Sequence, residues 1–151
     1  MKAALIVPVP ELAAVDAHRA ALDPSHASGV PPHVTIMFPF GTPDEIGVAG
    51  IARLAQAIQD VTAFEASFTF VGWFGQDVAW LRPRDDSGFR RLTSAVQAAF
   101  PEFEPYEGAH DDVVPHLTIG TVPPAQHHTL RAAIGEVERA LPLRTFVDAI
   151  H

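Results

Sequence analysis

A five-residue pattern that occurs twice constrains this chain more than any other feature. Residues 32–36 read Pro-His-Val-Thr-Ile, and residues 115–119 read Pro-His-Leu-Thr-Ile. Each copy opens a run of residues typical of a β-strand, and a helix that begins with proline is expected after each. The sequence therefore predicts an internal repeat, with one copy of the motif in each half.

Hydrophobic periodicity predicts elements in the order β-α-β-α-β-β-α-β-α-β. The expected strands are residues 3–9, 33–40, 64–74, 78–82, 116–122 and 145–150. The expected helices are residues 11–22, a segment that starts at the capping box 42–45, residues 87–100, and a segment that begins after Pro123-Pro124 and runs to about residue 141. We expect one domain of residues 1–151, with a first lobe of about residues 1–75 and a second of about 76–151. The motifs would lie at 33–35 and at 116–118.

The motif places its polar and apolar residues on opposite sides of a strand. Side chains alternate along a strand, so His33 and Thr35 point one way and Val34 the other. The same parity pairs His116 with Thr118. We expect the apolar side chains to face the helices of their own half. If the halves are related by a pseudo-twofold axis, both polar pairs meet in the groove between them.

Two imidazoles in one groove suit acid–base chemistry at a phosphodiester. With unperturbed pKa values near 6.5, one ring can be neutral and act as base while the other is charged and acts as acid. The hydroxyls of Thr35 and Thr118 can donate to the same bound anion. No metal is required, because imidazolium and hydroxyl groups can stabilise the developing charge. The plainer interpretation is that His33 and His116 are two structural histidines at the starts of strands.

The doubled His-x-Thr motif, its spacing and the element order resemble the two-histidine (2H) phosphoesterase superfamily, specifically its 2'-5' RNA ligase-like (LigT-like) group. The resemblance covers nearly the whole chain. It implies an α+β fold with two lobes, in which two antiparallel sheets line a central cleft and the helices lie outside. It also implies metal-independent hydrolysis of 2',3'-cyclic phosphates, with no cofactor. By this analogy His33 and His116 are catalytic, as acid and base respectively, and Thr35 and Thr118 bind the phosphate.

Other residues are weaker candidates for the site. Trp80 and Arg82 alternate on the strand 78–82, so one could stack on a base and the other meet a phosphate. A core tryptophan beside a surface arginine is an equal alternative. We expect Phe70, Trp73 and Phe74 in the core. We expect His18 and His26 to face solvent, and His127 and His128 to lie on an exposed helical turn. His110 and the other histidines lack the spacing of a zinc site. The acidic run between residues 102 and 112 is expected to form a loop that would repel a polyanion.

Charge and composition limit the partners. Ten Lys and Arg stand against eighteen Asp and Glu, for a formal net charge of −8. A protein that grips a long nucleic acid usually carries a basic face, so we expect a small nucleotide or a short RNA end as ligand. The chain has no cysteine and no apolar run long enough to span a membrane, and its first residues read as a strand. We expect a cytoplasmic monomer that does not bind membranes.

Several other functions are open or disfavoured. A non-catalytic module that binds phosphorylated nucleotides or RNA ends would keep the same groove. So would an RNA ligase, or a hydrolase of another phosphodiester such as ADP-ribose cyclic phosphate. The sequence lacks a Gly-x-Ser-x-Gly elbow, a Walker loop and a Gly-x-Gly-x-x-Gly after a strand, which argues against serine hydrolases, nucleoside triphosphatases and dinucleotide enzymes.

Overall fold

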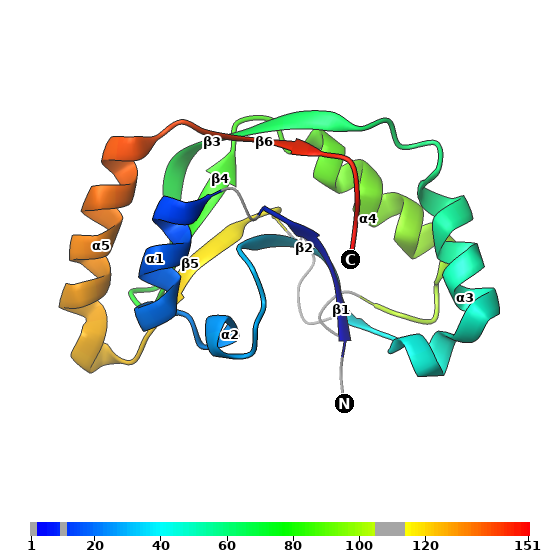
Figure 1. Cartoon of the computed structure of the whole chain (residues 1–151), viewed down its shortest axis with the longest axis horizontal. Coiled ribbons are helices and arrows are strands. Elements are labelled where there is room, and N and C mark those ends of the chain that lie inside the picture. Colours follow the sequence, from blue (N-terminus) through cyan, green and yellow to red (C-terminus); the bar gives the residue numbers. More distant parts are fainter. Residues whose placement is uncertain (1–2, 10–11, 105–113) are drawn as a thin grey trace.

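The computed structural model describes residues 3–9, 12–104 and 114–151, in which strands and helices alternate (Figure 1). The strands are β1 (Ala3–Pro8), β2 (His33–Phe40), β3 (Phe64–Phe74), β4 (Val78–Pro83), β5 (Leu117–Thr121) and β6 (Leu143–Val147). The helices are α1 (Ala13–Leu22), α2 (Pro24–Ala27), α3 (Pro43–Ile58), α4 (Ser87–Ala99), the 3-10 turn η2 (Pro124–Gln126) and α5 (His127–Ala140). The α+β class predicted from the sequence is confirmed.

The differences from the expected elements are local. The four-residue helix α2 was not expected, because it is too short to show a helical period; the side chain of Asp23 caps it by accepting from the backbone N–H of Ser25. The last strand starts earlier and ends earlier than predicted. The capping box of α3 is present: Thr42 accepts from the N–H of Glu45 at 3.3 Å, and Glu45 accepts from the N–H of Thr42 at 2.7 Å.

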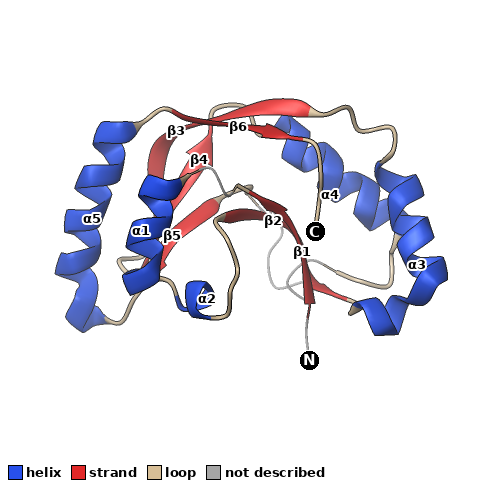
Figure 2. Cartoon of the chain, in the orientation of Figure 1, coloured by secondary structure: helices blue, strands red, loops and turns tan. Residues whose placement is uncertain are grey.

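The strands form one antiparallel sheet in the order β1-β2-β5-β4-β3-β6 (Figure 2). The two sheets implied by the family resemblance are therefore two parts of one sheet. They meet where the motif strands β2 and β5 pair, with Val34 opposite Leu117. This single junction brings the two motifs together, although they lie in different halves of the chain.

The strand pairings of the first half recur in the second. β1 pairs with β2 as β4 pairs with β5, and β3 pairs with both β4 and β6. The pairing of β3 with β4 has its counterpart between the end of the chain and β1, where His151 and Ile6 exchange two backbone hydrogen bonds of 2.8 Å. The end of the chain thus runs beside β1, as Figure 1 shows. The correspondence matches β1, β2 and β3 to β4, β5 and β6.

The helices do not stay with their own halves, which corrects one expectation. Helix α1 packs on β5 and α5, and helix α4 packs on β2 and α3. The apolar side of each motif strand therefore packs on a helix of the other half. In Figure 1, α1 and α5 lie together at one end of the molecule and α3 with α4 at the other. This exchange ties the two halves into one hydrophobic core.

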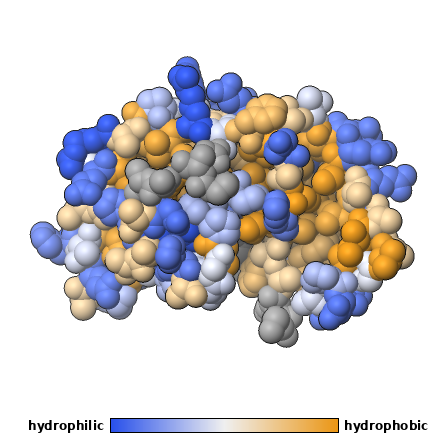
Figure 3. Space-filling model, in the orientation of Figure 1, coloured by the Kyte–Doolittle hydropathy of each residue, from blue (hydrophilic) through white to orange (hydrophobic). Residues whose placement is uncertain are grey.

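The helices are amphipathic rather than apolar throughout. Their buried residues, such as Val15 on α1, Val96 on α4 and Ile134 on α5, face the sheet. Within residues 3–9, 12–104 and 114–151, no helix is both long and apolar enough to cross a membrane. Apolar side chains are also exposed at the end that carries α3 and α4, as Figure 3 shows; Val48 and Ile51 of α3 are among them.

Candidate active site

The polar residues of the two motifs lie on one face of two paired strands. Val34 and Leu117 stand opposite each other and are fully buried. Because side chains alternate, their neighbours point to the other face. The antiparallel register then sets two cross-strand pairs, His33 with Thr118 and Thr35 with His116. All four of these side chains are half-buried. Two imidazoles and two hydroxyls thus share one small area.

Both imidazoles are anchored in the same way. Nδ1 of His33 lies 2.9 Å from the carbonyl oxygen of Pro31, and Nδ1 of His116 lies 2.7 Å from that of Val114. A carbonyl oxygen can only accept, so Nδ1 carries the hydrogen in each ring. The other nitrogen, Nε2, is left to accept a proton when neutral or to donate one when charged. Each strand therefore presents a histidine in a defined tautomer.

Burial makes both rings harder to protonate. It lowers the pKa of His33 and of His116 below the ordinary value of 6.5, and the hydrogen bond to the backbone carbonyl opposes this in each case. The positive charge of His33 further lowers the pKa of His116. The two rings therefore lie within each other's electrostatic field. Around His33, Arg19 lowers the pKa and Asp23 raises it.

Aromatic rings border His116. The ring of Trp80 lies 5.6 Å from it between centroids and that of Phe74 lies 5.3 Å away, both edge-on. Trp80 is only 7% exposed, and Gly72 makes room for it: a Cβ at Gly72 would lie 2.4 Å from the indole. Nε1 of Trp80 is buried, and no residue in the described part of the chain accepts its hydrogen. A buried N–H without an acceptor costs about 1–3 kcal/mol, so an acceptor brought within reach of this nitrogen would stabilise it.

Trp80 and Arg82 both belong to this face. Trp80 pairs with Thr118, and the same register carried on from Leu81 and Leu117 puts Arg82 opposite His116. The sequence left open whether Trp80 is a core residue or lines the site. It does both, because it is buried and its ring also contacts His116. The guanidinium of Arg82 is exposed and lies over the ring of Phe70, 5.2 Å from its centroid.

The expectation that Phe70, Trp73 and Phe74 are core residues is wrong. They are 46%, 37% and 48% exposed. For Phe70 and Phe74 the cause is a register shift in β3 between Phe68 and Phe70: Phe68 is fully buried, and an unshifted strand would have turned both rings to the buried face. Sequence reasoning therefore missed Phe74 as a neighbour of His116. Gly72, a glycine inside a strand, was the available signal.

A second feature missed from sequence is the buried Arg19. It is fully buried and donates to the carbonyl oxygen of Val30 and to Oγ of Ser25, each at 2.9 Å. It also contacts the carboxylates of Asp16 at 2.8 Å and Asp23 at 3.1 Å. The spacing of Asp16, Arg19 and Asp23 on one helical face was the signal. This network holds the segment that leads into the first motif.

The other histidines that the structure describes do not join the motif pair. His127 contacts Asp77 at 2.6 Å, and His18 contacts Glu136 at 3.1 Å. His18 is thus partly covered by α5 rather than fully in solvent. Of the residues expected in the acidic run, those from 105 to 112, with His110, lie outside the described residues. Among the residues that the structure describes, no group of three or more His, Asp or Glu could hold a metal ion.

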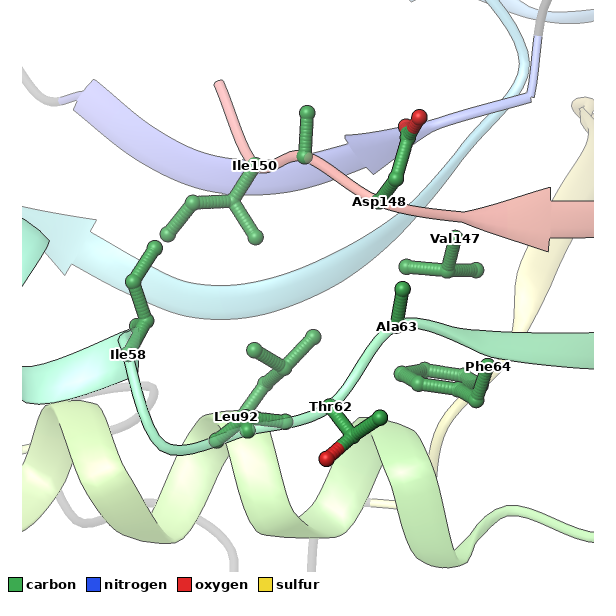
Figure 4. A pocket seen from close by; sticks show the side chains of 10 residues that line it. Ile58, Thr62, Ala63, Phe64, Leu92, Val147, Asp148 and Ile150 are labelled. Atoms are coloured by element: carbon green, nitrogen blue, oxygen red, sulfur yellow. The ribbon is translucent and has the colours of Figure 1, made fainter.

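An apolar cavity lies away from the motifs. It measures about 80 Å³ and is lined by the loop between α3 and β3, by α4 and by the chain after β6 (Figure 4). Its lining is mostly aliphatic, with Ile58, Leu92 and Val147 among the residues. No motif residue lines it, and it offers no acid–base pair.

The fold and the paired motifs define a class: α+β proteins in which two strands, one from each half of the chain, present a histidine and a threonine on one face. The chain belongs to the 2'-5' RNA ligase superfamily, whose model matches residues 7–151. The superfamily is one of two-histidine phosphoesterases and ligases, so the protein belongs to an enzyme family with phosphodiester chemistry.

A solved structure supports the fold. The crystal structure of TT0787 of Thermus thermophilus matches with a TM-score of 0.62 and 19% sequence identity, over 100% of this chain and 83% of that chain. At this identity the likeness speaks for the fold alone. The comparison with curated proteins gave no match.

Proposed function

We propose that the protein is a metal-independent phosphodiesterase that hydrolyses 2',3'-cyclic phosphates of nucleotides or of short RNA ends. The observation that carries the proposal is the pairing of β2 with β5, which sets His33 and His116 in one electrostatic field on one face. Both rings keep Nε2 for a ligand. Such a pair fits a reaction that needs one base and one acid.

In the proposed reaction, Nε2 of neutral His116 takes a proton from water as the water oxygen attacks phosphorus. The bond from phosphorus to one ribose oxygen breaks, and Nε2–H of charged His33 protonates that oxygen. One water is consumed and one phosphomonoester forms. The two histidines end with their proton states exchanged, and proton transfer through solvent restores them.

The charge distribution supports this direction of proton transfer. The charge on His33 lowers the pKa of His116, so a charged His33 favours a neutral His116. His116 has aromatic rings beside it, which solvate a cation less well than water does. His33 would therefore enter the reaction as the acid and His116 as the base.

Other side chains of the same face would hold the substrate. Thr35 and Thr118 would donate to the non-bridging oxygens of the phosphate, where negative charge develops. The N–H of Trp80, which has no acceptor among the described residues, would meet a ligand acceptor, and its neighbour Phe74 offers an exposed ring to a base. Arg82 would turn from Phe70 toward the phosphate.

Turnover of the four 2',3'-cyclic mononucleotides and of a cyclic-phosphate-ended oligonucleotide, with and without EDTA, tests the proposal. We expect turnover that EDTA does not change, and a loss of roughly 10²–10⁴-fold in His33→Ala and in His116→Ala. His128→Ala, an exposed histidine on α5, is the matched control and should keep full activity.

Two results would count against the proposal. Full activity in either motif variant would remove the histidines from the chemistry, and a strict metal requirement would replace the mechanism. Binding of cyclic phosphates without turnover would favour a non-catalytic module instead, and joining of RNA ends would favour a ligase.

A further inference from the structure

Three arginines lie on the face that carries the motif histidines, farther along the sheet. Arg82 pairs with Phe70 across β4 and β3, and Ser67 of β3 pairs with Arg144 of β6. The backbone N–H of Arg84 donates to the carbonyl oxygen of Ser67 at 2.7 Å. Arg84 follows directly after β4 and continues its pairing with β3 through this bond, so the alternation of β4 carried on by one residue puts Arg84 on the same face as Arg82. Arg82, Arg84 and Arg144, with Phe70 beside Arg82, form what we call the arginine surface.

The arginine surface is exposed, and its arginines form no ion pair with the residues that the structure describes. All three arginines and Phe70 are exposed to solvent. In the described part of the chain no carboxylate forms an ion pair with them, whereas three other arginines are paired in this way: Arg19, Arg53 and Arg90. In a protein with a net charge of −8, three unpaired arginines on one face make a local attraction for anions.

The arginine surface is continuous with the candidate active site. Arg82 stands opposite His116 in the register of β4 and β5. From strand spacing and rise, the Cα of Arg84 lies about 8 Å from that of His116, and Arg144 lies two strands farther across the sheet. Acidic residues limit the surface at its far side: Glu65 of β3 pairs with Phe146, and Asp148 follows β6.

We propose that the arginine surface binds the nucleotides that precede the terminal cyclic phosphate of an RNA strand. The preferred substrate class is then a short oligonucleotide end rather than a free cyclic mononucleotide. Arg84 and Arg144 contact backbone phosphates, and Phe70 offers a ring on which a base stacks. Glu65 and Asp148 repel phosphates farther along, so the surface takes only a few nucleotides. This inference rests on the proposed function.

The test compares kcat/KM for a 2',3'-cyclic mononucleotide and for a tetranucleotide that ends in the same cyclic phosphate. The variant is Arg84→Ala with Arg144→Ala, and the matched control is Arg131→Ala with Arg139→Ala, two exposed arginines of α5. We expect wild type and control to prefer the tetranucleotide. The variant should lose roughly tenfold on the tetranucleotide, equivalent to about 1.4 kcal/mol, and keep its rate on the mononucleotide.

Salt dependence gives a second readout. Each lost phosphate contact on a single strand should lower the slope of log affinity against log salt by about 0.7, so the double variant should lose about 1.4. An unchanged preference or slope in the variant would overturn the inference. An equal loss on both substrates would overturn it as well, because the arginines would then serve the reacting phosphate itself.

Binding separates this inference from the proposed function. A fluorescent tetranucleotide with a 3'-phosphate, which cannot turn over, should bind wild type more tightly than the double variant by the same roughly tenfold factor. If no cyclic phosphate is hydrolysed but this difference remains, the proposed reaction fails and the arginine surface stands. If cyclic mononucleotides turn over and the difference is absent, the reaction stands and the arginine surface fails.

Discussion

Arg19 donates to the carbonyl oxygen of Val30 at 2.9 Å, and this contact links a buried charge on α1 to the entrance of the first motif. The next carbonyl, that of Pro31, accepts from Nδ1 of His33. Two consecutive peptide units therefore connect the guanidinium to the imidazole. Arg19 acts on His33 through the backbone, which makes it a positioning residue rather than one that touches substrate.

Replacing Arg19 should affect both stability and the pH profile. Arg19→Met leaves the buried carboxylate of Asp23 without its cationic partner, so we expect a loss of about 3–5 kcal/mol in the free energy of unfolding. Arg19 lowers the pKa of His33, so its removal should also move the basic limb of the activity profile to higher pH. Urea unfolding and kcat against pH measure the two effects.

A milder substitution of Arg19 separates its effect on His33 from a general loss of the fold. Arg19→Lys keeps the charge but not the planar fork, so it should lower kcat without moving the basic limb. Arg131→Ala, on the surface of α5, should change stability by less than about 0.5 kcal/mol. A normal kcat in Arg19→Lys would show that the fork does not orient His33.

The activity should depend on pH through both histidines. In the active form His33 is charged and His116 is neutral, so the rate falls at low pH as His116 gains a proton and at high pH as His33 loses one. Since burial lowers both pKa values below 6.5, the optimum of kcat/KM should lie below about pH 6.5. A flat profile from about pH 5 to pH 9 would mean that the histidines do not carry the proton transfers.

The motif threonines should matter for rate more than for stability. Thr35→Val and Thr118→Val keep the β-branched shape that suits a strand and remove only the hydroxyl. If each hydroxyl stabilises the developing phosphate charge, kcat should fall by about 10²–10³-fold. Thr121→Val, at the exposed end of the same strand β5, should leave kcat unchanged. Equal rates in all three variants would take the hydroxyls out of the reaction.

Gly72 should be intolerant of a side chain. A Cβ there would lie 2.4 Å from the indole of Trp80, so Gly72→Ala must displace a ring that contacts His116. We expect a loss of about 1–3 kcal/mol in the free energy of unfolding together with lower kcat/KM. Gly135→Ala in α5 meets only Arg139, at 4.0 Å, and should stabilise the protein by about 0.5–1 kcal/mol. Gly72→Ala with wild-type stability would show that Trp80 is not held in place.

Much of the fold could be read from local patterns. The strand Phe64–Phe74 and the helix start at Thr42 were predicted at their observed residues, because alternation and capping depend on neighbours in sequence. The exposed Phe70 could not be predicted, since a register shift in β3 reverses the alternation. The position of α1 over β5 was also missed, because a helix pattern shows which face is buried but not which strand it covers.

The amino-acid sequence by itself determined the doubled motif and the side of the strand on which each histidine lies. These depend on residues only a few positions apart. Only the tertiary structure decided that β2 pairs with β5 and that Trp80, Phe74 and the arginine surface share the face of the histidines. Strand pairing joins residues far apart in the chain through backbone hydrogen bonds, and the pattern of side chains along each strand does not show which strand will be its partner.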